Sequence, residues 1–390
     1  MGFDYQQGRR LLEAAKRDKT PRRFFDEIGD ALQKRELRGH DFSIKKLFES
    51  FVPDGREIVD SWSANEGKGT GVQLKESGVS TSDFSNITGQ IFYNQMMEEF
   101  ENPDYIGTRL VETVPTNLSG EKIAGISNLS DDIETVGEGK PYPRAGVSED
   151  FVETPETTKR GMIVPITKEA IYFDRTGQLL ERCRKVTETM AINKEKRILD
   201  AVLGITSSYN RKNRGVVATY GDNSGNHDWD NLAASNALQD YTDIEAAMLL
   251  FDALTDPNTG EPIMIGSQVT IVVPKALEVT AARILAAIEY RQVSNTNNTT
   301  IGGNPLQYLR RNFSLESSPY VKQRTSSDSS WFVGNFPKGF KYMENWGPTS
   351  VEAPTNSYEE FHNDIVAQYK ISERGVPAVI EPRYAVKCTS

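Results

Sequence analysis

The chain has 390 residues, of which 37% are hydrophobic and 26% are charged, and its formal net charge is -10 at pH 7. This balance is typical of a folded protein with one large or two ordinary domains, and it excludes an intrinsically disordered chain. No stretch reaches the roughly 18 uncharged apolar residues of a membrane helix, and the first residues contain no apolar signal segment, so we expect no membrane association.

Residues 1–60 are predicted to form three short helices. Pro21 after Thr20 starts one of them, and Ser43 caps another that ends before Pro53. Each helix has one apolar face and is too short to bury that face alone, so we expect the helices to dock on the main body or on a neighbouring subunit. Residues 63–78 are rich in Gly, Ser and Lys and are predicted to be a flexible arm.

A helix is expected over residues 87–100, and β structure begins at residues 122–126. Residues 128–160 are polar and rich in Gly and Pro, and they lie between two strand-like pieces, 121–126 and 161–167. We predict a long, two-stranded projecting hairpin here, with 150–154 and 157–163 in its returning leg. A hairpin without support is only marginally stable in water, so we expect it to rest on a partner surface.

The strongest helical pattern covers residues 177–203, with Thr176 as its predicted N-cap. This range lacks proline and carries an apolar stripe that includes Leu179, Cys183 and Met190. At 1.5 Å per residue such a helix spans roughly 40 Å. A plate-like subunit needs a rod of this length, whereas few compact enzymes do.

The pattern then becomes helix, strand, helix. A predicted capping box at Thr242 to Glu245 starts the first helix, residues 268–273 form a short buried strand, and apolar residues from Leu277 to Ile288 build the second helix. Residues 294–304 are rich in Asn, Thr and Gly and are predicted to be an exposed loop. The last hundred residues are predicted to be rich in β-strand, at 330–333, 339–343, 364–373 and 378–387.

Catalytic and metal-binding signatures are absent from the sequence. The three histidines form no HExxH motif, no GxSxG elbow occurs, and Cys183 and Cys388 form no CxxC pair, so we expect no enzyme activity, no cofactor and no metal. Residues 67–70 lack the spacing of a phosphate-binding loop and are better explained as linker. The acidic stretches 222–228 and 256–261 lack an EF-hand frame and are expected to be turns.

Several segments together resemble the major capsid protein of tailed bacteriophages and prophages with the Hong Kong 97 fold. The run 136–139 is similar to the "VGEG" that is common in the extended loops of that family. Residues 158–169 with Asp174 resemble the passage from this loop into the spine helix, and residues 364–374 resemble its closing strands. The order and spacing of these segments over residues 83–390 carry the resemblance.

The resemblance implies an α+β fold with an N-terminal arm, an extended β-hairpin loop, a long spine helix, and peripheral and axial domains. The implied divisions are 1–82 for the helical N-terminal region and arm, 83–126 for the start of the peripheral domain, 127–162 for the extended loop, 163–242 for the peripheral domain with its spine helix 177–203, 243–362 for the axial domain, and 363–390 for the closing peripheral strands.

The resemblance also implies a function: pentamers and hexamers that form an icosahedral shell around double-stranded DNA, assembled in the bacterial host cytoplasm and located in the virion. Scaffold, portal and decoration proteins are the further partners that it implies. Charged residues of the extended loop are expected to pair with an adjacent subunit: Glu138, Lys140, Arg144, Glu149 and Lys159.

Residues 1–46 contain 12 Lys and Arg against 8 Asp and Glu. The basic side chains of this segment, with Arg9, Arg10, Arg22 and Arg23 as the expected interior-facing set, are either solvated or in non-specific contact with packaged DNA or scaffold. Two other classes of function stay open at this point. One is an encapsulin-like shell that encloses a cargo enzyme, and the other is an enzyme whose site is formed by loops distant in sequence.

Overall fold

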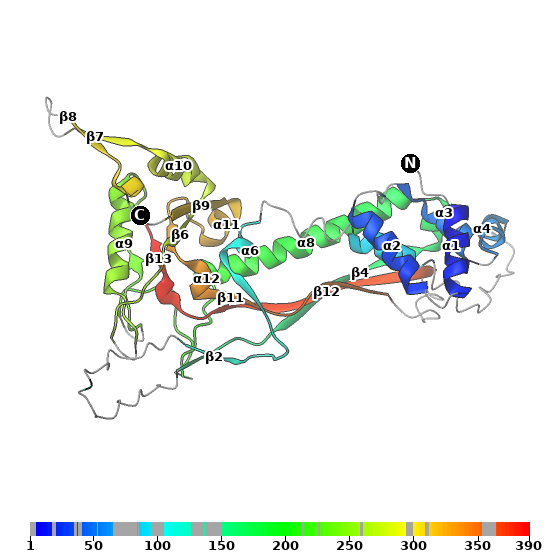
Figure 1. The fold of residues 1–390 in the computed structure, drawn as a ribbon, viewed down its shortest axis with the longest axis horizontal. Coiled ribbons are helices and arrows are strands. Elements are labelled where there is room, and N and C mark those ends of the chain that lie inside the picture. The colour runs from blue at the N-terminus through cyan, green and yellow to red at the C-terminus, as the bar shows by residue number, and fades with distance from the viewer. Residues whose placement is uncertain are drawn as a thin grey trace. The chain divides into compact units, whose positions relative to one another are not determined.

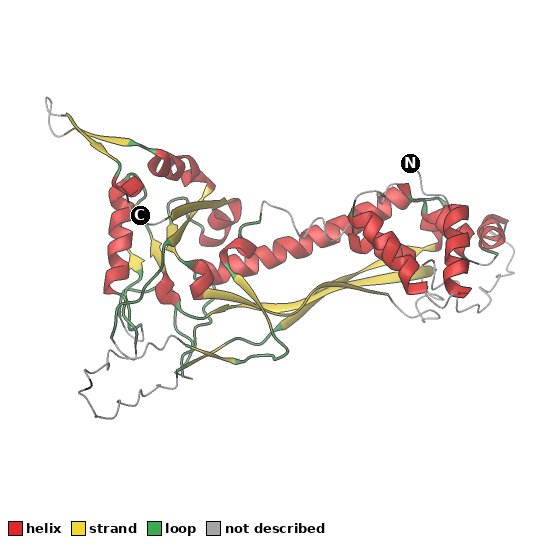
Figure 2. Ribbon diagram, in the orientation of Figure 1, coloured by secondary structure: helices red, strands yellow, loops and turns green. Residues whose placement is uncertain are grey.

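A computed structural model shows a mixed α and β protein, in agreement with the predicted α+β class (Figures 1 and 2). The structure describes the following residues: 5–17, 21–34, 37, 41–52, 54–64, 84, 86–94, 105–125, 136, 150–212, 214–224, 227–257, 260–293, 299–308, 312–352 and 364–390.

The chain divides into two compact units. The first consists of Met1–Asn102, Lys159–Ile192 and Trp346–Glu373, and the second consists of Pro103–Thr158, Asn193–Asn345 and Arg374–Ser390. Three long elements contribute residues to both units: α8 (Thr176–Val202), β11 (Phe340–Glu352) and β12 (Ile365–Val379).

The first unit contains the N-terminal helices. They are α1 (Tyr5–Arg17), α2 (Pro21–Gln33), α3 (Ile44–Phe51) and α4 (Gly55–Ala64), followed by a helix over residues 86–94. The Ser43 side chain accepts a hydrogen bond from Lys46 N at 3.2 Å, which confirms the predicted cap. The prediction of three helices was wrong, because four are present among the described residues up to 64.

These helices bury their apolar faces on their own chain. Phe48 and Phe84 pack edge to face with ring centroids 5.4 Å apart, and both belong to one cluster with Leu179, Cys183 and Tyr369. Phe92 packs edge to face against Tyr369 at 5.0 Å. The N-terminal helices therefore dock within the subunit, which was one of the two predicted outcomes.

The long helix is α8, Thr176–Val202, with 27 residues, and it agrees with the predicted range 177–203. Thr176 was expected to be its N-cap, and this was wrong. Instead the Thr176 hydroxyl accepts from Ile44 N at 2.9 Å and donates to Asp174 Oδ1 at 2.7 Å, so it connects α8 to the start of α3. α7 (Lys168–Tyr172) precedes α8, and Thr167 caps it.

A four-stranded sheet has the order β1-β11-β12-β4, where β1 is Glu112–Pro115 and β4 is Thr158–Thr167. β1 pairs in parallel with β11, from Glu112 opposite Lys341 to Pro115 opposite Glu344. β4 is an edge strand whose first six residues are exposed. A Cβ at Gly161 would lie 2.3 Å from Ile371 O, so only glycine permits this close approach to β12.

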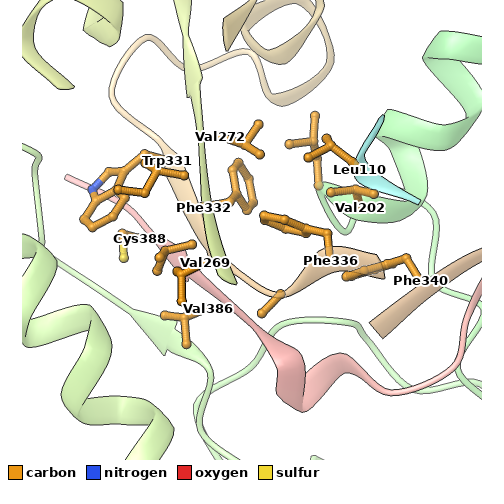
Figure 3. Packing of buried hydrophobic residues seen from close by; sticks show 14 of the residues in the cluster. Leu110, Val202, Val269, Val272, Trp331, Phe332, Phe336, Phe340, Val386 and Cys388 are labelled. Carbon is orange, nitrogen blue, oxygen red and sulfur yellow. The ribbon is translucent and has the colours of Figure 1, made fainter. Parts of the chain in front are cut away.

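The second unit contains a five-stranded sheet of order β5-β13-β10-β6-β9. Its strands are β5 (Leu232–Ala233), β13 (Ala385–Cys388), β10 (Trp331–Gly334), β6 (Gln268–Pro274) and β9 (Asn312–Ser318). α9 (Tyr241–Ala253) packs on β13, and α10 (Glu278–Ala286) and α11 (Pro319–Thr325) pack on β6 and β9. Trp331, Phe332, Phe336 and Val386 are fully buried in the resulting core (Figure 3), and burial of each such side chain contributes about 1.5–3 kcal/mol.

The remaining described elements of the second unit are short. They are α6 (Gly107–Leu110), β2 (Lys122–Ala124), β3 (Phe151–Glu153), η2 (Lys275–Leu277), β7 (Glu289–Val293), β8 (Thr299–Gly303), η3 (Pro305–Tyr308), α12 (Phe336–Gly339) and η4 (Pro382–Tyr384).

Two local predictions in this unit were wrong. The capping box of α9 uses Asp240 and Asp243 rather than Thr242 and Glu245, because the backbone becomes helical two residues earlier than expected. The predicted exposed loop 294–304 contains β8, which pairs antiparallel with β7, and it ends at the buried Asn304. Residues 294–298 lie outside the described part of the chain.

Proline at position 190 tests the role of α8. Met190 is buried, and Met190→Pro removes a helical hydrogen bond and clashes with the preceding turn, at a cost of about 3 kcal/mol or more. We expect insoluble or largely unfolded protein by circular dichroism. The exposed neighbour Thr189→Ala is the control, with an expected change within about 0.5 kcal/mol. A folded Met190→Pro protein of normal stability would contradict this account.

Candidate assembly site

Of the five charged loop residues expected at an intersubunit contact, four lie outside the described residues: Glu138, Lys140, Arg144 and Glu149. The glycine-rich stretch 67–70 also lies outside them. Lys159 lies in the exposed first half of β4, next to Arg160. Met162 and Ile163 follow with exposed fractions of 48% and 56%, so this edge of the sheet presents both charge and apolar surface.

The basic residues of the N-terminal region are placed only in part. Arg9 and Arg10 are exposed on α1, and Arg9 Nε lies 3.2 Å from Glu13 Oε1. This pair is a surface ion pair within one helix, which is worth about 0.3–0.5 kcal/mol. Arg22 and Arg23 lie in the first turn of α2, and their side chains are outside the described set.

The predicted ribbon begins as a two-stranded sheet. β2 pairs antiparallel with β3, with Lys122 opposite Glu153, Ile123 opposite Val152 and Ala124 opposite Phe151. The prediction that 157–163 belongs to the same returning leg was wrong. These residues enter β4, which is next to β12, because the long β12 offers a longer row of backbone partners than the three-residue β2.

β3 is held on its other side by the segment that starts at Tyr209. Glu153 N donates to Asn210 O at 2.9 Å, and Lys212 N donates to Phe151 O at 3.0 Å. Tyr209 is buried, its hydroxyl donates to Glu381 Oε2 at 3.1 Å, and burial is the main cause that raises its pKa. The base of the ribbon is therefore tied to the core of the second unit.

A buried carboxylate stands at the point where the chain enters β3. The Asp150 side chain is 1% exposed, and Arg211 Nε lies 2.9 Å and 3.0 Å from its two oxygens. Lys212 Nζ is 4.0 Å from the same carboxylate. Gly125 N donates to Asp150 O at 3.2 Å, so the outgoing and returning chains meet at this residue.

A second hairpin, β7 and β8, is fixed at its base by Asn304. The Asn304 Nδ2 donates to Ile284 O and Ala287 O, each at 2.9 Å, and its Oδ1 accepts from Leu306 N at 3.1 Å. The two carbonyls belong to the last turn of α10 and to the residue after it, which a helix leaves without internal partners. One side chain thus joins the end of α10 to the residue that follows the returning strand β8. Figure 1 shows α10 and the hairpin of β7 and β8 that follows it along the chain.

Metal-ligating side chains do not gather among the described residues. No group of three His, Cys, Asp or Glu side chains among them is placed to hold a metal ion. Asp222 accepts from Ser224 Oγ at 2.6 Å, and Gly260 N donates to Asp256 O at 2.8 Å, while residues 225–226 and 258–259 of the two acidic stretches lie outside the described residues. Cys183 and Cys388 are fully buried, as small apolar side chains are. No helix among the described residues has the length and apolar character to cross a membrane.

The sequence matches a family model described as "Phage capsid protein" over residues 152–388, which is more than half of the chain. The chain belongs to the phage capsid protein family. The matched range begins in β3 and ends in β13, so it includes α8 and the five-stranded sheet. A comparison with curated proteins found no match to this capsid protein.

Solved structures with some likeness include the SrpI encapsulin of Synechococcus elongatus, with 11% identity, a TM-score of 0.43, and 74% of this chain and 87% of that chain covered. They also include a chain of Mycobacterium phage Patience, with 11% identity, a TM-score of 0.43, and coverage of 76% and 86%. A chain of Gordonia phage Cozz gives 13% identity, a TM-score of 0.42, and coverage of 73% and 86%. The family assignment rests on the sequence model and not on these likenesses.

Sequence reasoning missed Asp150, Arg211 and Asn304. Asp150 and Arg211 are 61 positions apart, and nothing in either local pattern indicates that they pair. Asn304 was included in a polar loop, although the apolar Leu306 two residues later was a signal that the chain returns to the core there.

Replacement of Asn304 by alanine should loosen the β7–β8 hairpin. Asn304→Ala removes three hydrogen bonds and leaves buried carbonyls without a donor, at about 1–3 kcal/mol for each such group. We expect faster hydrogen exchange of the amides of β7 and β8, measured by mass spectrometry. Gln268→Ala, at the exposed start of β6, is the control, and equal exchange in the two variants would contradict the assigned role.

Both cysteines should be unreactive in the folded protein. Burial raises the pKa of Cys183 and of Cys388 to about 12, so at about pH 8 both are neutral thiols. A thiol reagent should label neither of them in native protein and both of them in concentrated guanidinium chloride.

The pKa shift also predicts a pH dependence of stability. The Cys183 thiol has a pKa near 9.0 in the unfolded chain and of about 12 in the folded protein. Above pH 9 the unfolded chain loses the thiol proton more readily than the folded protein does. The free energy of unfolding is therefore unaffected below pH 9 and falls as pH rises toward 12. Measurement of the free energy of unfolding by denaturant at several pH values across this window detects the loss.

In the labelling experiment, rapid reaction of the native protein with the thiol reagent would contradict the prediction, because it would show that a thiol is accessible.

Proposed function

We propose that this protein is the major capsid protein of a tailed bacteriophage, whose copies assemble as pentamers and hexamers into an icosahedral shell around double-stranded DNA. The observation that carries the proposal is the match to the phage capsid family over residues 152–388. A capsid subunit is a structural component, and the family therefore also supports a non-enzymatic protein in the virion.

The proposed divisions of the subunit follow the Hong Kong 97 scheme. Residues 1–82 form the helical N-terminal region and arm, 83–126 the start of the peripheral domain, 127–162 the extended loop, 163–242 the peripheral domain, 243–362 the axial domain, and 363–390 the closing peripheral strands. Helix α8 is the spine helix of this scheme, and its 27 residues suit that role.

The extended loop is proposed to lie over an adjacent subunit, with Glu138, Lys140, Arg144, Glu149 and Lys159 in intersubunit ion pairs. Exposed pairs contribute only about 0–1 kcal/mol each, so such contacts act through repetition across many copies. The exposed apolar side chains of Met162 and Ile163 in β4 support a second contribution from burial of apolar surface.

The N-terminal region is proposed to meet packaged DNA through Arg9, Arg10, Arg22 and Arg23. The exposure of Arg9 and Arg10 on α1 supports this contact. It is non-specific, because phosphate charge supplies the attraction, and it weakens as salt concentration rises. Scaffold, portal and decoration proteins are the further proposed partners, and assembly in the bacterial cytoplasm is the proposed location.

Electron microscopy of the purified protein tests the proposal. We expect shells, tubes or capsomers, and a compact monomer by size-exclusion chromatography under all assembly conditions would contradict it. Particles isolated from producing cells and assayed for nucleic acid and for protein cargo separate a DNA-filled capsid from an enzyme-filled compartment.

Deletion of the loop tests its proposed role. Because Gly125 N and Asp150 O are hydrogen-bonded, the ends of the segment are adjacent, and residues 128–147 can be replaced by a short Gly-Ser linker without removal of β2 or β3. We expect a subunit with normal circular dichroism and melting temperature that fails to close shells. Particles of normal size from this variant would show that the loop is dispensable for closure.

A further inference from the structure

The ribbon base formed by β2 and β3 is too small to fix its own direction. Three residue pairs join the two strands in the described part of the ribbon, and a two-stranded ribbon in water is marginally stable. Three residues at its open end lie in direct contact: Gly125 on the outgoing chain, Asp150 on the returning chain, and Arg211 on the segment that flanks β3.

Arg211 pairs with the Asp150 carboxylate. Its Nε lies 2.9 Å and 3.0 Å from the two oxygens, and the two side chains are 14% and 1% exposed. Arg211 also forms an antiparallel bridge with Val152, so its backbone is fixed relative to β3. The ion pair therefore determines where the residue before β3 lies.

Gly125 also lies against Asp150. Its amide donates to Asp150 O at 3.2 Å, and a Cβ at position 125 would lie 2.9 Å from the carboxyl carbon and from one oxygen of Asp150. A side chain at this position would force the Asp150 carboxylate to shift from its place. The close approach thus disfavours any side chain at position 125, for reasons of space and not of backbone angle.

A buried ion pair is an inefficient source of stability. Desolvation of the two charges offsets much of their attraction, and apolar residues of similar size often serve folding equally well. What the pair provides instead is a defined geometry, because the guanidinium and the carboxylate accept few relative orientations.

We propose that Gly125, Asp150 and Arg211 form a clamp that sets the direction in which residues 126–149 leave and re-enter the subunit, and that these three are positioning residues for shell assembly. The clamp rests on the proposed capsid function. Each of its members belongs to the same unit of one chain, so the clamp needs no contact with a second subunit. Without the clamp, residues 126–149 would leave the subunit in many directions, and few of these would suit contact with an adjacent subunit.

The test compares two variants of the full-length protein with a matched control. Arg211→Gln removes the guanidinium that holds Asp150 and leaves Lys212 in place, whereas Gly125→Ala leaves all the charges in place and fills the space beside the carboxylate. Arg214→Gln is the control, since Arg214 carries the same charge, lies three positions away in the same segment and is exposed. Each protein is measured for circular dichroism, for hydrogen exchange of residues 121–125 and 151–153, and for the yield of closed shells by electron microscopy.

We expect both variants to keep the wild-type circular dichroism, to exchange these amides faster than the control does, and to lose about tenfold in the yield of closed shells. Shells of wild-type size and yield from Arg211→Gln and Gly125→Ala overturn the clamp while they leave the proposed function intact. Loss of helical signal in both variants also overturns it, because the three residues would then serve folding. A wild-type protein that never forms shells overturns the proposed function itself.

Discussion

The continuity of α8 is the constraint on which the rest of the structure depends. Its buried residues belong to two separate hydrophobic clusters: Leu179, Cys183 and Met190 to one, and Ile198, Leu199 and Val202 to the other. A single run of backbone hydrogen bonds thus connects two cores that share no member.

Polar groups define the irregular parts of the second unit. The ribbon base depends on the Asp150 carboxylate, the β7–β8 hairpin on the Asn304 amide, and the entry to α6 on Glu195, which accepts from Ile106 N and Gly107 N at 3.1 Å and 2.7 Å. Burial raises the pKa of Glu195, while these two amides oppose that rise. In each case one side chain satisfies backbone groups that regular structure leaves open, so short elements have fixed positions without a large apolar core of their own.

The parts that periodicity controls could be predicted from the sequence, and the parts that depend on distant contacts could not. Helix α8, strand β6 and the Ser43 cap were identified because each signal lies within a few neighbouring residues. The pairing of β4 with β12 and the partnership of Asp150 with Arg211 depend on chain segments far apart in sequence, which no local pattern contains. Four of the five charged loop residues expected at the intersubunit contact lie outside the described residues, so their role stays a prediction.

The packing of the N-terminal helices has a consequence for processing. Phe48, Phe84 and Cys183 belong to one cluster, and the amide of Ile44 is bonded to the hydroxyl of Thr176. Proteolytic removal of the chain ahead of residue 84 would remove Phe48 from this cluster and expose the apolar side chains that remain, including Cys183 of α8, to water. The shortened protein would then need other apolar surface to cover them. A tag or cargo protein fused before α1 would be attached to helices that form part of the folded core of the subunit.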